Sequence, residues 1–200
     1  MKKNMQYPLK LSFRKTLRGE QIDVRDSSKM AVFHVRQKLS ANIDANVYIE
    51  HEDSQKLYTI SVNRSSDCVG QYCVTDQDGV NISSIKQQMK SLWKAYYQIY
   101  DGSTPIMTIR NKNQYVKLAD TVFEYIPVLN WFTGCIFRPT YNVRTDGEVV
   151  MKMTKKPSFH KETFVIEKVS EIGDREQTVI LLSLIMITLL GRLRWSIVIN

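Results

Sequence analysis

Cysteine is scarce in this chain and irregularly spaced. The 200 residues include three cysteines, Cys68, Cys73 and Cys135, which is an odd number without a Cys-x-x-Cys pair. A disulfide framework and a zinc site are therefore not expected, and Cys68 and Cys73 are expected only to pack. A reducing compartment fits this cysteine usage best.

The chain also lacks an initial apolar run and the motifs of familiar catalytic sites. Its first residues, MKKNMQYPLKLSF, alternate apolar and polar positions instead of forming the continuous apolar core of a signal peptide, so we expect a cytoplasmic protein. Neither Gly-x-Ser-x-Gly nor a phosphate-binding glycine loop occurs, and no Asp or Glu stands at metal-ligand spacing from His34, His51 or His160. These absences predict a protein that is not an enzyme and holds no metal or cofactor.

The composition is that of a globular domain with a tendency toward β-structure. Hydrophobic residues make up 43% and charged residues 24% of the chain, and ten Tyr, seven Phe and three Trp accompany many Val and Ile. Aromatic and β-branched side chains pack well on a pleated sheet. The formal net charge of +8 favours phosphate-bearing partners, although a basic excess of this size also serves solubility alone.

A two-residue periodicity predicts strands along most of the chain. It begins at Tyr7, Leu9, Leu11 and Phe13, which alternate with polar residues. Five acidic turns then separate similar segments: Asp26-Ser27-Ser28-Lys29, Glu52-Asp53-Ser54-Gln55, Asp76-Gln77-Asp78-Gly79, Asp101-Gly102 and Asp146-Gly147. In the last three turns Gly supplies the positive φ of a tight hairpin and Asp bonds the turn amides. The repeated strands and turns predict a meandering antiparallel sheet.

Residues 114–137 interrupt this rhythm. The segment QYVKLADTVFEYIPVLNWFTGCIF is apolar and aromatic, has no clean period and contains Pro127. It is either a segment that plugs one end of the sheet or an exposed aromatic loop that enters a bilayer interface.

Residues 174–195 predict a helix that is apolar on every face. Between Val179 and Leu190 the polar residues are Ser183 and Thr188, and Gly191 is the expected C-cap. A helix of this kind must be buried in protein or in membrane. Twelve residues span roughly 18 Å, well short of the roughly 30 Å hydrocarbon core of a bilayer.

A transmembrane alternative requires extending the apolar run to Ile199, which would place Arg192 and Arg194 within the membrane at an unfavourable free energy. We therefore favour burial inside a sheet that closes on itself, because its inward side chains supply apolar contacts on all sides. The prediction is a mainly β, single-domain protein over residues 1–200, a closed antiparallel β-barrel around a central hydrophobic C-terminal α-helix.

Essentially the whole chain resembles the tubby C-terminal-like superfamily, which includes tubby proteins, phospholipid scramblases and LURP-one-related proteins. Two stretches carry the resemblance most clearly. They are RPTYNVRTDGEVVMKMTKKPSFHKETFVIEKV, from Arg138 to Val169, and YYQIYDGSTPIMTIR, from Tyr96 to Arg110. The first is similar to bacterial scramblase-related members. The resemblance implies about twelve strands around the helix, and a function between phosphoinositide binding and lipid scrambling. The acidic calcium-binding segment of animal scramblases is not found.

Basic clusters are the most promising surface features. We expect anionic phospholipid or phosphoinositide headgroups to contact Arg14, Lys15, Lys152, Lys155 and Lys156, with membrane contact by the aromatics Phe123, Tyr125, Trp131 and Phe132. The protein would then be peripheral at the inner membrane surface. The same cations could instead form a solvated outer barrel face.

Two other functions remain open from sequence: a protein-interaction scaffold without a lipid role, and a membrane-inserted scramblase that uses the C-terminal helix as a span. Nucleic acid is not an expected partner, because the basic charge is scattered through strands and no nucleic-acid-binding motif is visible.

Overall fold

The computed structural model describes residues 5–16, 19–37, 45–48, 55–62, 71–89, 95–112, 139–157 and 162–198. These residues form twelve strands and a long helix. Their bounds are β1 (Leu9–Thr16), β2 (Gly19–Arg25), β3 (Ala31–Gln37), β4 (Ala45–Tyr48), β5 (Lys56–Val62), β6 (Tyr72–Asp76), β7 (Asn81–Met89), β8 (Ala95–Asp101), β9 (Thr104–Asn111), β10 (Thr140–Thr145), β11 (Glu148–Lys156), β12 (Thr163–Lys168) and α3 (Asp174–Val198).

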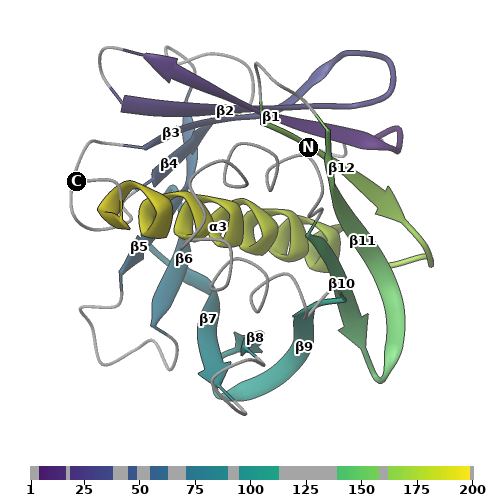
Figure 1. The fold of residues 1–200 in the computed structure, drawn as a ribbon. Coiled ribbons are helices and arrows are strands. Elements are labelled where there is room, and N and C mark those ends of the chain that lie inside the picture. Colours follow the sequence, from purple (N-terminus) through teal and green to yellow (C-terminus); the bar gives the residue numbers. More distant parts are fainter. Residues whose placement is uncertain are drawn as a thin grey trace.

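The strands form a closed antiparallel barrel (Figure 1). Each strand pairs with its neighbours in the chain, and β1 also pairs with β12, where Leu9 lies opposite Ile166 and Ser12 opposite Thr163. A closed sheet has no edge strand that exposes unpaired backbone groups. The predicted fold class, a barrel of about twelve strands, is confirmed.

Alternation along each strand separates the core from the outer surface. In β1, Leu9 and Leu11 are fully buried, whereas Lys10 and Arg14 are exposed. Successive side chains of a strand point to opposite faces of the sheet, so the apolar set lines the inside of the barrel. The two-residue periodicity seen in the sequence therefore reflects burial on one face.

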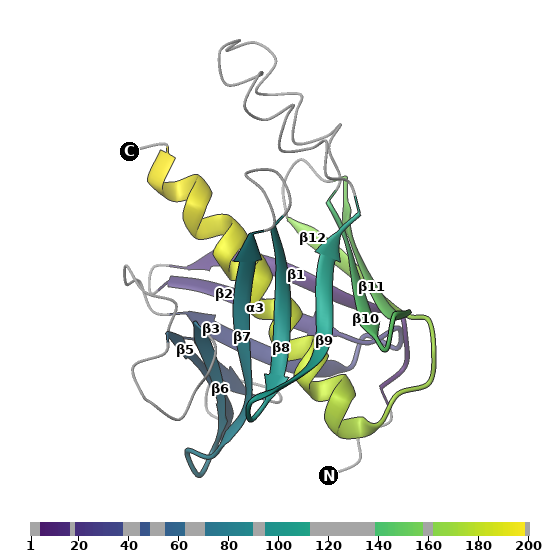
Figure 2. The ribbon, with the colours of Figure 1, turned by 90° about the horizontal axis from the view of Figure 1, so that it is seen from below.

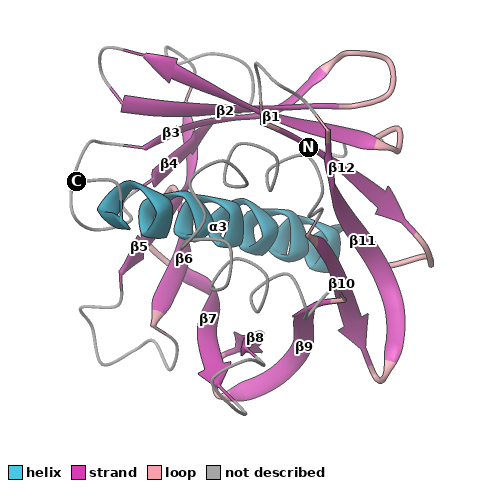
Figure 3. Cartoon of the chain, viewed as in Figure 1, coloured by secondary structure: helices cyan, strands magenta, loops and turns pink. Residues whose placement is uncertain are grey.

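Helix α3 fills the interior of the barrel (Figure 3). Every residue from Val179 to Leu190 is buried. The two polar side chains in this stretch bond the helix backbone: Ser183 Oγ donates to the Val179 carbonyl at 2.8 Å, and Thr188 Oγ1 donates to the Ile185 carbonyl at 2.7 Å. The predicted buried helix is confirmed. Among the described residues, no helix has the length and apolarity needed to cross a bilayer.

The predicted end of this helix was wrong. The helix does not stop at Gly191 but continues to Val198. A glycine inside a helix costs only about 1 kcal/mol relative to alanine, so Gly191 by itself need not end the helix. The start was predicted correctly at Asp174, where the backbone N–H of Gly173 donates to Glu176 Oε2 at 3.2 Å.

The barrel has two different ends (Figure 2). At the first, the turn end, short turns join β2 to β3, β6 to β7, β8 to β9 and β10 to β11. Helix α3 enters there, since Arg175 Nη2 lies 3.1 Å from the Asp101 carboxylate beside the β8–β9 turn. At the second, the loop end, β1, β3, β5, β7, β9 and β11 finish, and α3 runs toward it.

Two of the turns have the same hydrogen-bonded geometry. The Asp26 carboxylate accepts the N–H of Met30 at 2.9 Å, and the Asp76 carboxylate accepts the N–H of Val80 at 2.9 Å. In both turns the residue before that N–H has a positive φ, 66° at Lys29 and 82° at Gly79. The expectation that the aspartate of a glycine-containing turn would bond the turn amides is confirmed at Asp76.

This equivalence predicts the effect of exchanging the two positive-φ residues. A non-glycine residue in the left-handed region is strained by roughly 1 kcal/mol, so Lys29→Gly is expected to raise the free energy of unfolding by about 0.5 to 1 kcal/mol. Gly79→Lys is expected to lower it by a similar amount. Urea denaturation of both variants checks this, and two changes of the same sign would contradict the shared geometry.

The buried hydroxyl of Tyr7 is expected to make the free energy of unfolding depend on pH in the alkaline range. This hydroxyl is buried without a hydrogen-bond partner among the described residues, and burial raises the pKa of Tyr7 far above the usual 10. The folded state therefore retains the phenol proton, while the unfolded chain loses it near pH 10. The free energy of unfolding should consequently fall as the pH rises above about 10.

The variant Tyr7→Phe tests this dependence. It is expected to show a shallower decline above pH 10, by at most about 1.4 kcal/mol per pH unit. Burial and the Asp76 carboxylate also raise the pKa of Tyr58, but Tyr58 is present in both proteins, so the difference between their urea titrations isolates Tyr7. Parallel declines would show that Tyr7 ionises equally in the folded and unfolded states.

Cys73 corrects the expectation that the cysteines only pack. It lies in β6, is 7% exposed, and takes part in a disulfide bond whose other cysteine is outside the described residues. An odd number of cysteines without a spaced motif gives no sign of such a bond, because the fold decides which thiols meet.

Candidate anion-binding surfaces

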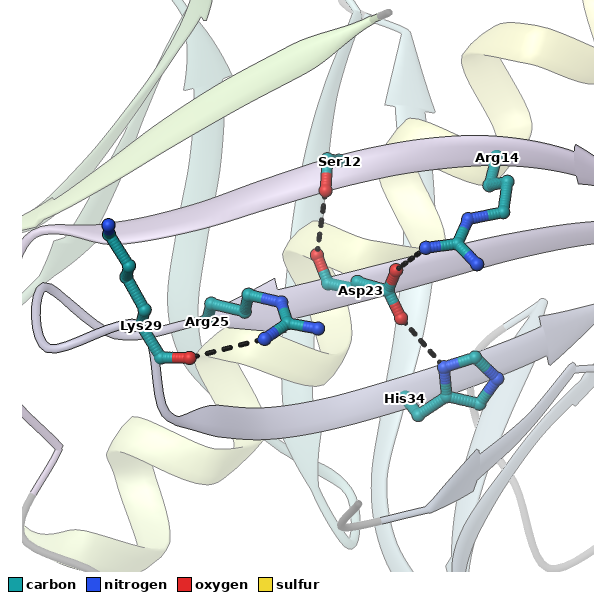
Figure 4. A network of polar contacts seen from close by, with 6 residues as sticks. All are labelled: Ser12, Arg14, Asp23, Arg25, Lys29 and His34. Atoms are coloured by element: carbon teal, nitrogen blue, oxygen red, sulfur yellow. Dashed lines mark hydrogen bonds and ion pairs between the residues drawn. The ribbon is translucent and has the colours of Figure 1, made fainter. Parts of the chain in front are cut away.

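Arg14 lies on the outer face of β1, where it belongs to a polar network (Figure 4). Its guanidinium is 3.3 Å from the Asp23 carboxylate on β2, and the other oxygen of that carboxylate is 2.8 Å from His34 Nδ1 on β3. The Arg14 side chain remains 60% exposed. It can still contact an anion, but Asp23 opposes part of its charge.

Lys152, Lys155 and Lys156 do not share one face of β11. Lys152 and Lys156 alternate with the buried Met151 and Met153 and so lie on the outer face, whereas Lys155 is opposite the buried Phe164. Lys152 Nζ is 3.9 Å from Glu167, and Lys155 Nζ is 2.7 Å from Glu162.

The five cations that the sequence analysis grouped as an anion-binding cluster therefore do not form one continuous surface. Lys156 is exposed and forms no ion pair within the described part of the chain. Lys15 lies in β1 with its backbone opposite Glu20. Of the predicted set, the strand positions of Arg14, Lys15, Lys155 and Lys156 lie toward the loop end.

The predicted aromatics Phe123, Tyr125, Trp131 and Phe132 lie outside the described residues, as does the rest of 113–138. The attachment points of this segment are described. The N–H of Lys112 donates to the Thr140 carbonyl at 2.7 Å, and the N–H of Lys155 donates to the Pro139 carbonyl at 3.1 Å. The chain therefore leaves and re-enters the barrel at the loop end, directly beside Lys112 and Lys155.

A groove of about 600 Å³ runs along the outer wall of the barrel over β8, β9 and β10. We call it the wall groove; β8 and β9 stand at the front of Figure 2. Strand register arranges its central side chains in two rows, with Gln98, Thr108 and Arg144 in one row and Arg110 and Asn142 in the next. Tyr96 of β8 is opposite Arg110, beside the groove. Lys112 lines it toward the loop end, and Asp146 and Gly147 line it at the turn end.

The cations of the wall groove differ from those of the predicted cluster. Within the described residues, Arg110, Lys112 and Arg144 are exposed and none of them forms an ion pair. The Asp146 carboxylate is the acidic group of the lining, so three positive charges less one negative charge leave a formal charge of +2. An anion entering this groove would not have to displace an existing carboxylate partner.

Sequence reasoning missed Arg110 and Arg144 because they are far apart in the chain. Each is a polar residue at an outward position of a strand, which is the usual place for a solvated charge. The alternation Thr108-x-Arg110 and Asn142-x-Arg144 shows that each faces outward. Only the pairing of β9 with β10 brings them together, and the long interruption between those strands concealed that pairing.

Charge is distributed unevenly between the two ends of the barrel. Acidic residues gather at the turn end: Asp26, Asp76, Asp78, Asp101, Asp146, Glu171, Asp174 and Glu176. Some are matched by cations there, as in the pairs Arg175–Asp101 and Lys168–Glu171. The described part of the loop end carries Arg14, Arg110, Lys112, Lys155 and Lys156, with Glu162 as a nearby acid. The loop end is thus the more basic of the two.

Comparison with protein families identifies the fold independently. A family model described as LURP-one-related matches residues 33–187, a range that begins in β3 and ends within α3. Comparison with curated proteins and with solved structures gives no match. The matching model belongs to the tubby-like and scramblase-related superfamily, as the resemblance of residues 138–169 implied. Because the match covers more than half of the sequence, the chain belongs to the LURP-one-related family.

Proposed function

We propose that this protein is a non-enzymatic, peripheral membrane protein that docks on anionic phospholipid surfaces with the loop end of its barrel. The observation that supports this proposal is the position of the apolar, aromatic segment 113–138. It is attached between Lys112 and Pro139, at the more basic end of the barrel.

Electrostatics and apolar contact would act together at this end. A Lys or Arg near an anionic membrane surface contributes about 1 kcal/mol of attraction. Trp and Tyr partition to the headgroup region, and residues 113–138 include Tyr115, Tyr125 and Trp131. The acidic turns at the opposite end would point away from the anionic surface, which favours one orientation.

Helix α3 has no part in this proposal. Its apolar residues from Val179 to Leu190 are all buried among the strands, so membrane contact by this stretch would require opening the barrel. The proposal therefore concerns the outer surface alone, and it does not include lipid scrambling.

Co-sedimentation with vesicles tests the proposal. One vesicle is pure phosphatidylcholine and the other contains about one third phosphatidylserine, and both are examined between roughly 0.05 and 0.5 M salt. The protein is expected to pellet with the phosphatidylserine vesicles and to be released as salt rises. Equal pelleting with both vesicles, or no effect of salt, would contradict it and favour a protein-interaction scaffold.

A further inference from the structure

The two arginines of the wall groove stand close enough to hold one anion. Arg110 is directly opposite Asn142, and Arg144 is directly opposite Thr108, so the arginines occupy diagonal positions on neighbouring strands. Diagonal neighbours on one face of a sheet lie roughly 7 to 8 Å apart, within reach of long side chains. Both guanidinium groups can therefore approach an anion placed between them.

Each arginine is held in position by one contact. Arg144 Nη1 donates to the Gly147 carbonyl at 2.7 Å, and the Arg110 guanidinium lies 5.2 Å from the centroid of the Tyr96 ring. A guanidinium has five N–H donors, so these contacts leave several of them for a ligand. The planar donor fork matches phosphate oxygens, which it binds with two parallel hydrogen bonds.

Neutral polar groups surround the arginines. The side chains of Gln98, Thr108 and Asn142 provide amide and hydroxyl groups, and Asp146 provides a carboxylate acceptor at the turn end. Asn142 Oδ1 is buried and accepts no hydrogen bond among the described residues. A turn of this amide about its soft terminal torsion would let a ligand hydroxyl donate to it. The groove thus offers donors for an anion and acceptors for hydroxyl groups.

We infer that the wall groove is a binding site for a phosphate monoester carried on a hydroxylated ring, such as a sugar phosphate or the phosphorylated headgroup of a lipid. Its volume of about 600 Å³ lies within the range of small-molecule sites. The site is on the wall of the barrel, and Arg144, which lies toward its turn end, takes no part in the proposed docking through the loop end. The inference about the wall groove can therefore be tested independently of the proposed membrane function.

Isothermal titration calorimetry with soluble probes tests the site directly. The probes are glucose 6-phosphate, inositol 1,4-bisphosphate and inorganic phosphate, with unphosphorylated inositol as the control ligand. We expect saturable binding of one inositol bisphosphate per chain and none of inositol. No saturable binding of either phosphorylated ring would overturn the inference, and so would inorganic phosphate that binds as tightly as both.

A pair of matched variants distinguishes a defined site from diffuse charge. Arg110→Gln with Arg144→Gln is expected to weaken binding by tenfold or more, since each removes a charge-assisted contact to phosphate. Lys86→Gln removes a cation on the neighbouring strand β7 that does not line the groove, and it is expected to leave affinity within about twofold. Equal losses in both proteins would contradict the inference.

Vesicles separate the two sources of the ligand and the two proposals. Phosphatidylserine vesicles carry phosphate diesters without a monoester, and Arg144 lies toward the turn end, so the single variant Arg144→Gln should pellet with them as the parent does. On vesicles that contain phosphatidylinositol 4-phosphate, Arg144→Gln should pellet less than the parent only if the groove binds lipid headgroups. Retention of Arg144→Gln on those vesicles, together with weaker binding of the soluble phosphates, would assign the groove to soluble ligands.

Discussion

Leu184→Ala is expected to lower the free energy of unfolding by about 3 to 5 kcal/mol, the range for a leucine removed from an enclosed core. Leu184 is fully buried in the middle of α3. The helix is surrounded by a closed sheet. The neighbouring strands therefore cannot move inward to fill the cavity that the missing carbon atoms leave. Urea denaturation of the parent and the variant measures the difference.

Two controls separate enclosure from a general effect of substitution. Ser183→Ala, on the same helix, removes a hydroxyl that bonds only the helix backbone, so a change within about 0.5 kcal/mol is expected. Val169→Ala alters a residue that is 56% exposed and should be equally mild. A loss below about 1 kcal/mol for Leu184→Ala would show that α3 is not enclosed by the barrel.

Reversing two charges at the loop end is expected to weaken binding to phosphatidylserine vesicles by roughly 1,000-fold. Lys112 and Lys156 are exposed, and neither forms an ion pair among the described residues. Changing both to Glu removes two attractions to the anionic surface and adds two repulsions. The apparent dissociation constant from vesicle titration at low salt measures the loss.

The matched control places the same charge change at the turn end. Lys10 and Lys56 are also exposed lysines, at the beginnings of β1 and β5. Lys10→Glu with Lys56→Glu gives the same net charge as the loop-end variant, and it is expected to change the dissociation constant by less than about threefold, because contributions fall off within a Debye length of the membrane. If both double variants lost affinity equally, binding would depend on net charge and not on orientation.

Local patterns carried most of the information about the fold. The alternation in β1 and the turns at Asp26, Asp76 and Asp146 predicted strands and hairpins, because each depends on interactions within a few residues. The apolar stretch of α3 from Val179 to Leu190 predicted a helix that other parts of the protein surround on all sides. Its true end could not be read from Gly191, because glycine ends a helix only where no other interaction prolongs it.

The wall groove and the disulfide depend on contacts between distant parts of the chain. Arg110 and Arg144 become neighbours through the register of β9 and β10, which no local pattern specifies. Lys155 is a different case, since the alternation Met151, Met153, Lys155 already put it on the inward side of β11. Grouping it with Lys152 and Lys156 by sequence proximity ignored that information.

Closure of the barrel through β1 and β12 also constrains the order in which the protein can fold. The pair Leu9 and Ile166 joins residues more than 150 positions apart, and α3 follows all twelve strands in the chain. Such distant pairing makes folding slow, because the entropy of closing the loop is lost before the contact forms. Until α3 has been synthesised, the inward apolar faces of the strands have no helix to pack against. A nascent chain of this design would therefore depend on protection from aggregation during translation.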